Sequence, residues 1–378
     1  MEKAGQLTLM TCFAEVEDPR VGPAQLHKLE DVLTIAICGV ICGANDWVNI
    51  ELFGQAKEEW LKTILELPNG IPSHDTFGRV FRALDPEQFE QGFLNWVMSI
   101  QEVTEGEVIA IDGKKLRRSH DGLLGKDAIW MVDAWASENQ ITLGQLKVDE
   151  KSNEITAIPK LLDLLMIKGC IVTIDAMGCQ TKIAEKIVEA GADYVLAVKE
   201  NQGILHRDIE WLFEVAKQVE FEQIPHDHTK TVNKHGRIEV RQCWSISHSD
   251  YIEYLQKHQS WKNLKTIAMV ETEFRHGDQI SCQRRYYVSS LDADAQTILH
   301  AVRTHWQVEN SLNWVLDVTF REDDSRVRKG AGPHNMAMLR RLALNLLKRE
   351  TSVKRSIQGK RFLAGWDNDY LLKILFNS

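Results

Sequence analysis

Apolar residues recur along this chain with two different periods, and the change of period divides it into stretches. Up to about residue 100 the spacing is helical, as in HKLEDVLTIAICGVICGANDWVNIELFGQAKEEWLK. Ser73 follows Pro72 and is placed to cap a helix that carries Phe77 and Phe81. We therefore expect residues 1–100 to form a helical N-terminal domain.

From residue 101 the pattern changes to the short apolar runs that are typical of buried strands. VIAID, AIWMVDAWA and ITLGQLKV predict three strands in succession. A helix capped near Ser152 (SNEITAIPKLLDLLMIKG), the strand IVTID, the helix KIAEKIVEAG and the strand YVLAVK follow. This order is that of a ribonuclease H-like α/β domain, in which the first and fourth strands lie side by side. A doubly wound sheet is the alternative, but it would place a helix after the first strand and a Gly-rich phosphate loop, which the sequence lacks.

Residues 203–292 interrupt this alternation. A helix (GILHRDIEWLFEVAKQV) precedes the strand-like segments RIEVRQCWSIS, KTIAMVETEFR and SCQRRYYVSS, which predict a mostly β insertion. The α/β domain, residues 101–202, then resumes over 293–350, and 351–378 form a C-terminal tail. In the insertion, Arg237, Glu239 and Arg241 share one face of a strand. Such a face is most often solvated, and its two arginines are also candidates for gripping a backbone phosphate.

Composition favours an ordinary globular protein of two or three domains, with 378 residues of which 44% are hydrophobic and 26% charged. No signal peptide is visible. The longest apolar run, Val32 to Ala44, is shorter than the roughly 20 residues of a membrane span. Seven cysteines without regular spacing predict reduced thiols in a cytoplasmic protein. Cys38 and Cys42 lie four apart, and we interpret them as core residues rather than a metal site.

The formal net charge of -9 argues against a nucleic-acid partner, but the charges are unevenly placed. Residues 1–100 carry 7 Lys/Arg against 15 Asp/Glu, whereas 301–378 carry 14 against 8. A basic cluster (Lys114, Lys115, Arg117, Arg118) follows Asp112 and is a candidate for binding phosphate. For Ser73 to Val97, a packing domain is the plainer interpretation, and a helix-turn-helix with Arg79 and Arg82 facing DNA is the alternative.

Three carboxylates stand in chemically suggestive frames. Asp112 in VIAIDGKKLRRS and Asp175 in CIVTIDAMG each replace the next apolar residue of a strand, just before a turn. Glu309 lies in the amphipathic helical pattern THWQVENSLNWVLDVTFREDD. A buried, unpaired carboxylate costs several kcal/mol, so this layout asks for a cation. It is the layout that holds divalent metals.

Taken together, IDGKKLRRS, IDAMGCQ, VKENQ and HWQVENSLNWVLDVTFREDDSR resemble the DDE transposases of bacterial insertion sequences. The resemblance is closest to the H-repeat-associated proteins and covers nearly the whole chain. It implies a ribonuclease H-like fold with the metal-binding triad on Asp112, Asp175 and Glu309. It also implies double-stranded DNA as partner, at the ends of a mobile element and at its target, and a homodimer on paired ends.

One departure from related transposases concerns the residues around Glu309. Where those enzymes place Tyr, Arg and Lys, this chain has Val302, His305 and Leu316. His305 lies one helical turn before Glu309 and is a candidate to contact phosphate in place of the Arg. For the Lys, candidates further along the chain are Arg326, Arg328 and Lys329.

These residue types suit phosphodiester cleavage and strand transfer. Two Mg²⁺ ions about 3.5 to 4 Å apart, with Mn²⁺ as a substitute, activate the nucleophile and stabilise the leaving oxygen. Asp112 would bind both ions, and Asp175 and Glu309 one each. Nearby tryptophans are candidates for stacking on a base but are more often core residues: Trp135, Trp306 and Trp314. Four further acids, interpreted as solvated or paired with Arg321 and Arg326, are Asp317, Glu322, Asp323 and Asp324.

Two other functional classes remain open. A metal-dependent nuclease of the same fold would cleave DNA without transposing it. A catalytically inactive DNA-binding relic would bind the element ends only. Acids at all three positions argue against decay of the active site, and a cleavage and joining assay separates the classes.

Overall fold

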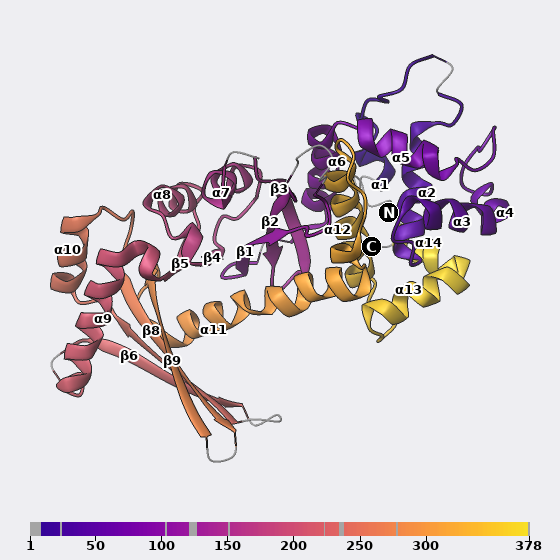
Figure 1. Ribbon diagram of the computed structural model, residues 1–378. Coiled ribbons are helices and arrows are strands. Elements are labelled where there is room, and N and C mark those ends of the chain that lie inside the picture. The colour runs from indigo at the N-terminus through magenta and orange to yellow at the C-terminus, as the bar shows by residue number, and fades with distance from the viewer. Residues whose placement is uncertain are drawn as a thin grey trace, which may run out of the picture.

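The computed structural model describes residues 9–22, 25–102, 104–120, 127–149, 152–222, 224–233, 238–276 and 279–376. Within these residues the chain is a mixed α/β protein built on one large sheet, with a helical body at one end and an arm at the other (Figure 1). The strands lie in the order β3-β2-β1-β4-β5-β9-β8-β7-β6.

The first half of the sheet has the strand neighbours that the sequence order predicted. Its strands are β1 Val108–Lys115, β2 Trp130–Ala136, β3 Ile141–Lys147, β4 Ile171–Ile174 and β5 Asp193–Val198. β2 pairs antiparallel with β1 and β3, whereas β4 pairs parallel with β1 and β5. The first and fourth strands are therefore adjacent, which confirms that part of the prediction.

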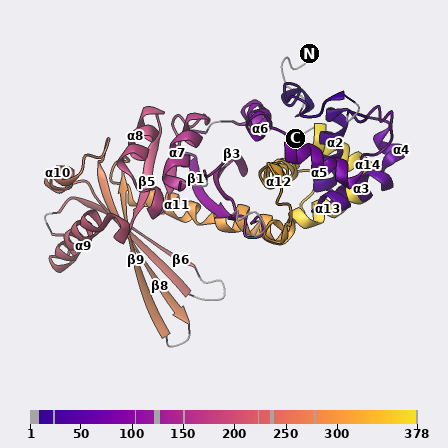
Figure 2. The ribbon, with the colours of Figure 1, turned by 45° about the horizontal axis from the view of Figure 1, so that its top comes forward.

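Helices cover both faces of this half-sheet. α7 (Glu154–Asp163) packs on β2 and β3, and α8 (Thr181–Glu189) packs on β5. α11 (Ala295–His305) crosses the other face, where it contacts β1, β4 and the arm (Figures 1 and 2). The chain then continues as two π-helical turns, Glu309–Asn313 and Val315–Thr319, towards the helical body.

The helical body combines both ends of the chain (Figure 1). Its helices are α1 Leu9–Cys12, α2 Leu29–Ile41, α3 Trp47–Ala56, α4 Glu58–Leu61, α5 His74–Ala83, α6 Pro86–Ile100, α12 Gly332–Arg349, α13 Ile357–Trp366 and α14 Asn368–Phe376. α12 packs against α2, α5 and α6 and also against β3, so it joins the body to the sheet. Ser73 caps α5 by accepting a hydrogen bond from the Thr76 amide, and Phe77 and Phe81 are buried, as predicted.

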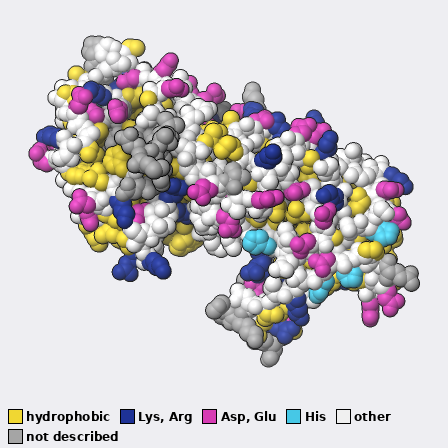
Figure 3. Space-filling view, turned by 180° about the vertical axis from the view of Figure 1, so that it is seen from behind, with side chains coloured by type: hydrophobic (Ala, Val, Ile, Leu, Met, Phe, Trp, Pro, Cys, Tyr) yellow, Lys and Arg dark blue, Asp and Glu magenta, His cyan; other side chains and the backbone are white. Residues whose placement is uncertain are grey.

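The arm consists of four antiparallel strands and two helices. They are β6 His226–Asn233, β7 Ile238–Ile246, β8 Thr266–His276, β9 Gln279–Ser289, α9 Gly203–Gln218 and α10 Ser249–His258. Because β9 pairs with β5, these strands extend the same sheet rather than forming a separate one. Seen from behind, the arm projects from the body, and basic side chains gather near its end (Figure 3). The sequence did not predict β6, because the polar run HDHTKTVN is almost entirely exposed and shows no alternation.

Two local boundaries differ from the prediction. β1 does not end at Asp112 but continues to Lys115, because β2 provides partners for Gly113, Lys114 and Lys115. Helix α7 begins at Glu154, where the Asn153 side chain, rather than Ser152, accepts a hydrogen bond from the Ile155 amide (3.1 Å).

The basic balance of residues 301–378 is only partly expressed at the surface. Four of its cations are almost completely buried, with exposed fractions of 2% for Arg340, 0% for Arg341, 7% for Lys360 and 1% for Arg361. Arg361 donates to the carbonyl of Val40 (2.9 Å), which ties α13 to α2. These charges hold the helical body together, so their number says little about a DNA partner.

A buried ionic cluster, formed by Lys114, Asp133, Glu322 and Arg341, connects α12 to the sheet. The Arg341 guanidinium donates to both carboxylate oxygens of Asp133 (2.5 and 2.7 Å) and to Glu322 Oε1 (2.8 Å). Lys114 Nζ lies 3.4 Å from Glu322 Oε2. The interpretation of Glu322 as solvated, or paired with Arg321 or Arg326, is therefore wrong. Its side chain is fully buried among cations that lie far from it in the sequence.

No helix in the described part of the chain combines the length and apolar character needed to cross a membrane. All seven cysteines are free thiols, and Cys38 is buried in α2.

Glu322 gives the stability of the fold a defined dependence on pH. Burial alone would raise the pKa of this carboxyl, but Arg341, Lys114 and Arg340 outweigh burial and lower the pKa from 4.5 to about 2. Because the folded pKa lies below the unfolded one, the stabilisation is complete above pH 4.5 and is lost as the pH falls towards 2. We expect roughly 3 kcal/mol of unfolding free energy to depend on this group.

The measurement is urea unfolding of the wild-type protein and of Glu322→Gln at pH 7 and in steps down to pH 3. The variant should lose about 3 to 5 kcal/mol at pH 7 and show a weaker decrease towards low pH. Asp292→Asn, at a carboxylate 90% exposed, is the control and should behave as the wild type. Parallel pH dependences for Glu322→Gln and the wild type would contradict this assignment.

Candidate active site

The three carboxylates predicted from the sequence line one cavity of about 170 Å³. In the parallel pairing of β1 with β4, Ile111 lies opposite Ile174. The next residues along the two strands are Asp112 and Asp175, which therefore lie at the same end of adjacent strands. Glu309 approaches from the helix that continues α11 across this face of the sheet.

Asp112 lies where its negative charge is disfavoured. Burial raises the pKa of its carboxyl to about 6; the hydrogen bond from Asn313 partly offsets this and the charge of Asp175 reinforces it. Asn313 Nδ2 donates to Asp112 Oδ2 (2.8 Å) and to Glu309 Oε2 (3.2 Å). The buried amide of Asn313 thus connects the acid on the strand to the acid on the helix.

Asp175 is oriented by the turn that follows it. Its Oδ1 accepts hydrogen bonds from the amides of Met177 (3.0 Å) and Gly178 (3.4 Å), so it caps the short 3-10 helix Ala176–Gly178. A Cβ atom at Gly178 would lie 2.2 Å from Ile174 Cγ2. The Asp-Ala-Met-Gly sequence therefore fixes the direction of the carboxylate.

Glu309 is exposed, and it begins the π-helical turn that Asn313 ends. π-Helical turns inside helices are uncommon and often occur at functional sites. Here the turn places the Glu309 carboxylate and the Asn313 amide within hydrogen-bonding distance of each other.

The donor set suits a divalent cation. Carboxylate oxygens are the ligands that Mg²⁺ prefers, and a cation would compensate the charge of the buried acids. As the side chains stand, no three acidic, imidazole or thiol groups among the described residues converge on one point. The Asn313 amide donates to both Asp112 and Glu309 and so holds the two carboxylates towards each other. The chemistry of these donors therefore fits a divalent metal.

His305 does not supply the positive charge that related transposases place there. Burial lowers the pKa of its imidazole to about 4, so the ring is neutral at physiological pH. Its Nδ1 lies 3.1 Å from Thr173 Oγ1 on the neighbouring strand. A neutral ring can offer phosphate a hydrogen bond but no ionic contact, so His305 stays a candidate phosphate contact without the charge of the Arg.

Two other cations line the cavity, and sequence reasoning did not identify either as a site residue. Lys199 directly follows β5 and belongs to the VKENQ segment; Arg285 comes from β9 of the arm. The Arg285 guanidinium stacks over Trp306, 4.3 Å from the ring centroid. The position of Lys199 at the end of a predicted strand was a usable signal. No sequence signal marked Arg285, because only the pairing of β9 with β5 brings it to the cavity.

A fourth carboxylate, Glu154 at the start of α7, also lies close to the site. A Cβ atom on Gly113 would be 2.1 Å from Glu154 Oε1, so the carboxylate packs directly against the backbone of β1. Burial, together with the charges of Asp175 and Asp112, raises the pKa of Glu154 to about 7. The glycine after Asp112 is thus needed for this close approach, and not for a turn.

The basic cluster after Asp112 is divided between the interior and the surface. Lys114 is buried, with its Nζ 2.6 Å from Asp317 Oδ1, so its charge is compensated within the protein and does not face DNA. The interpretation of Asp317 as solvated is likewise wrong. The other three cations remain exposed: Lys115, Arg117 and Arg118.

The remaining predicted acids, Asp323 and Asp324, form ion pairs with exposed cations of this cluster. Arg117 lies 3.3 Å from Asp323, and Arg118 lies 3.3 Å from Asp324. The predicted pairing of Asp324 with Arg321 is present (3.2 Å).

The other predicted DNA-binding residues lie outside the carboxylate cavity. Arg241 pairs with Glu239 in the arm (2.6 Å), and Arg237 lies outside the described residues. A second cavity, described below, is lined by Arg326, Arg328 and Lys329.

Leu316, where relatives place Lys, is completely buried, whereas Val302 lines the carboxylate cavity. Of the three tryptophans, Trp135 is a core residue, and Trp306 and Trp314 are about half exposed.

Comparison with known proteins identifies the family. Residues 10–97 match the family described as DDE_Tnp_1-associated, and residues 104–346 match the Transposase DDE domain. The first match covers the N-terminal helices and the second runs from β1 through most of α12.

Two relatives of similar length and one much shorter relative carry transposase names. "Putative transposase YncI" of Escherichia coli O157:H7 is 41% identical over 374 residues, 97% of this chain and 94% of that protein. "H repeat-associated putative transposase YhhI" of Escherichia coli (strain K12) is 40% identical over 358 residues, 93% of each chain. "Inactive transposase YbfQ" of the same strain is 43% identical over 72 residues, 19% of this chain and 86% of that protein.

A solved structure, the piggyBac transposase synaptic complex with hairpin DNA, matches with a TM-score of 0.44 and 14% identity, over 98% of this chain and 77% of that one. A likeness of this size carries no argument about the fold. The family match and the relatives of similar length identify the family instead. This chain belongs to the Transposase DDE domain family and is a transposase-like protein.

Proposed function

We propose that this protein is a DDE transposase that cleaves and transfers DNA strands at the ends of a mobile element. The observation that carries the proposal is the meeting of Asp112, Asp175 and Glu309, from three distant segments, around one cavity. The strand order β3-β2-β1-β4-β5 supports a ribonuclease H-like catalytic sheet.

Domains of this family use divalent metals, and we propose two Mg²⁺ ions, for which Mn²⁺ can substitute. Asp112 would contact both, with Asp175 and Glu309 each holding one. When bound, such ions activate a water or a 3′-hydroxyl at neutral pH and stabilise the leaving oxygen. The chain itself contributes rigid placement: the backbone amides after Asp175 fix one carboxylate, and Asn313 aligns the other two.

The cations in the cavity have a separate role in this proposal. Lys199 and Arg285 would contact the phosphate at the cleavage point, where the three acids would otherwise repel it. Arg285 is held in place by its stacking on Trp306, and it comes from the arm, so the arm contributes directly to the catalytic site.

Double-stranded DNA is the proposed partner, both as element end and as target. The exposed Lys115, Arg117 and Arg118 follow the catalytic strand and are placed to contact its backbone. A homodimer on paired ends is part of the same proposal and rests on the family resemblance alone.

The first prediction concerns the three acids. Labelled duplex carrying an element end is incubated with the protein in Mg²⁺, Mn²⁺ or EDTA, and the products are resolved for cleavage and for joining to a target duplex. Asp112→Ala, Asp175→Asn and Glu309→Gln should each reduce metal-dependent cleavage by about 10³-fold or more, because each removes a ligand needed in the transition state.

Asp149→Asn, at a carboxylate 71% exposed, is the matched control and should cleave like the wild type. Cleavage without joining in any metal would support the nuclease class instead. Binding without cleavage in any metal would contradict the enzymatic proposal and would identify the protein as a DNA-binding relic.

The second prediction concerns Asn313. Asn313→Ala removes the donor shared by Asp112 and Glu309. We therefore expect the Mg²⁺ concentration for half-maximal cleavage to rise, or the maximal rate to fall, by about 10- to 100-fold. A Mg²⁺ titration of cleavage measures this. The control Asn310→Ala changes an exposed amide in the same turn and should leave the titration unaltered. An unchanged titration for Asn313→Ala would show that the amide does not position the acids.

A further inference from the structure

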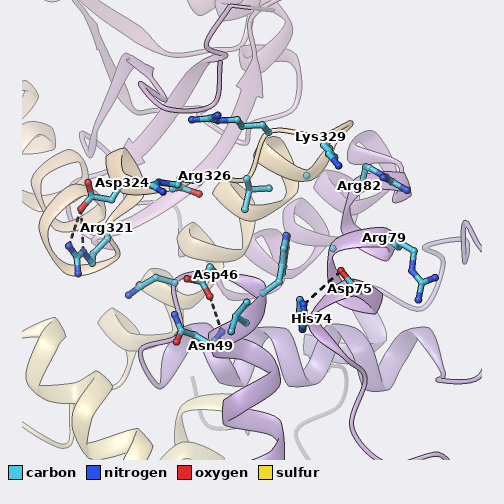
Figure 4. A pocket seen from close by; sticks show the side chains of 18 residues that line it. Asp46, Asn49, His74, Asp75, Arg79, Arg82, Arg321, Asp324, Arg326 and Lys329 are labelled. Carbon is cyan, nitrogen blue, oxygen red and sulfur yellow. Dashed lines mark hydrogen bonds and ion pairs between the residues drawn. The ribbon is translucent and has the colours of Figure 1, made fainter. Parts of the chain in front are cut away.

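A second and larger cavity lies between the helical body and the segment that follows the Glu309 helix. Its volume is about 840 Å³, and we call it the α5 groove. One wall is formed by α5 and the start of α3, and the other by residues 321–332. Figure 4 shows Arg79 and Arg82 on the α5 wall. On the other wall, Lys329 lies near Arg82, and Arg326 and Arg321 lie farther from it.

The charges that line the α5 groove are predominantly positive. Six cations face three acids; the cations are Arg79, Arg82, Arg321, Arg326, Arg328 and Lys329, and the acids are Asp46, Asp75 and Asp324. The acids are already engaged. Asp46 caps α3, Asp75 lies 3.8 Å from His74 Nε2, and Asp324 pairs with Arg118 and Arg321.

Most of the cations are not engaged in this way. In the described part of the chain, all of them except Arg321 are exposed and form no ion pair with a carboxylate: Arg79, Arg82, Arg326, Arg328 and Lys329. Five uncompensated cations around one concave surface, in a chain of net charge -9, form a local site for a polyanion.

The two walls are fixed to each other by the backbone. The amide of Ala331 donates to the carbonyl of Arg82 (3.0 Å), and Asn335 Nδ2 donates to the carbonyls of Phe81 (2.8 Å) and Leu84 (3.0 Å) at the end of α5. Gly330 has φ +55°, and a Cβ atom there would lie 2.5 Å from the Arg82 carbonyl oxygen. The two walls that carry the cations are therefore preformed, which reduces the entropy lost on binding.

The α5 groove is joined to the segment that follows β1. Arg328 Nε donates to the carbonyl of Arg118 (3.1 Å), and Arg118 belongs to the exposed basic cluster that follows β1 and Asp112. A polyanion lying in the groove would thus continue past this cluster to the end of the catalytic strand.

We infer that the α5 groove binds the sugar-phosphate backbone of duplex DNA beside the cleavage point, without reading its sequence. This inference rests on the proposed function and adds the N-terminal helices to the DNA-binding surface. Arg and Lys contacts to phosphate supply sequence-independent affinity. Single-stranded DNA is bound largely by aromatic stacking, and Trp47, the one Trp, Tyr or Phe among the described residues that line the groove, already stacks on Phe81 with ring centroids 4.8 Å apart.

For Ser73 to Val97, this inference replaces the plainer interpretation as a packing domain, and it keeps from the helix-turn-helix alternative that Arg79 and Arg82 face DNA. These two cations lie on the exposed face of α5 opposite the buried Phe77 and Phe81. They meet Lys329, which is about 250 residues away in the sequence, so no local pattern marks the site.

The test is binding measured in EDTA, so that no cleavage occurs. Fluorescence anisotropy with duplexes of about 30 base pairs, one carrying the element end and one scrambled, is recorded from about 50 to 200 mM NaCl. The variant Arg79→Ala/Lys329→Ala changes one residue on each wall and avoids Arg82, which packs on Gly330. The control Lys354→Ala/Arg355→Ala removes the same charge from two exposed cations outside the groove.

We expect the groove variant to lose about tenfold or more in affinity for both duplexes, with a salt dependence of log K shallower by about 2, whereas the control stays near the wild type. Wild-type affinity and slope in the groove variant would overturn the inference, as would equal losses in the control or a loss confined to the element-end duplex. Metal-dependent cleavage by a variant that binds normally would leave the proposed function intact. Normal wild-type binding without cleavage in any metal would count against the function alone.

Discussion

The arrangement of the catalytic strand, the Glu309 helix and the helical body depends on the buried ionic cluster of Lys114, Asp133, Glu322 and Arg341. A charge taken out of water must be matched, and here each member of the cluster matches another from a different segment. Lys114 lies two residues after Asp112, and Asp133 is paired with Asp112 in the sheet register. Glu322 follows the π-helical turns, and Arg341 lies in the middle of α12. Loss of any one member leaves an uncompensated charge beside the active site.

The cluster also explains the electrostatic contrast between the interior and the catalytic cavity. Lys114 is close to Asp112 in the sequence, yet its charge is compensated by Asp317 and Glu322. Among the described residues, Asp112, Asp175 and Glu309 have no ion-pair partner, and burial holds the pKa of Asp112 at about 6. Three acids without a cation around one cavity are the electrostatic property expected of a metal site.

The distribution of positive charge follows the same distinction. Many cations of the basic C-terminal region are buried and bind carbonyls or carboxylates, as Arg341 and Arg361 do. Among the described residues, cations without an ion pair line both the carboxylate cavity, as Lys199 and Arg285 do, and the α5 groove. Counts of charge along a sequence cannot separate these roles, because the role depends on burial and on partners contributed by distant segments.

The sequence by itself determined the order of most strands and helices, the cap of α5 at Ser73 and the family. It also determined the adjacency of β1 and β4, because a parallel crossover after three strands leaves few arrangements. These features depend on local periodicity, on caps and on short motifs, which neighbouring residues encode. From the adjacent strands, the meeting of Asp112 with Asp175 followed directly.

Only the tertiary structure decided which side chains complete the site. Asn313 bridges two acids because it ends the π-helical turn that Glu309 begins and also reaches Asp112 on β1, and Arg285 enters the cavity because β9 pairs with β5. Lys114 turned inward because Asp317 and Glu322 lie beneath β1. Each of these contacts joins segments roughly 90 to 200 residues apart, and the packing free energy that selects them leaves no periodic signal in either segment.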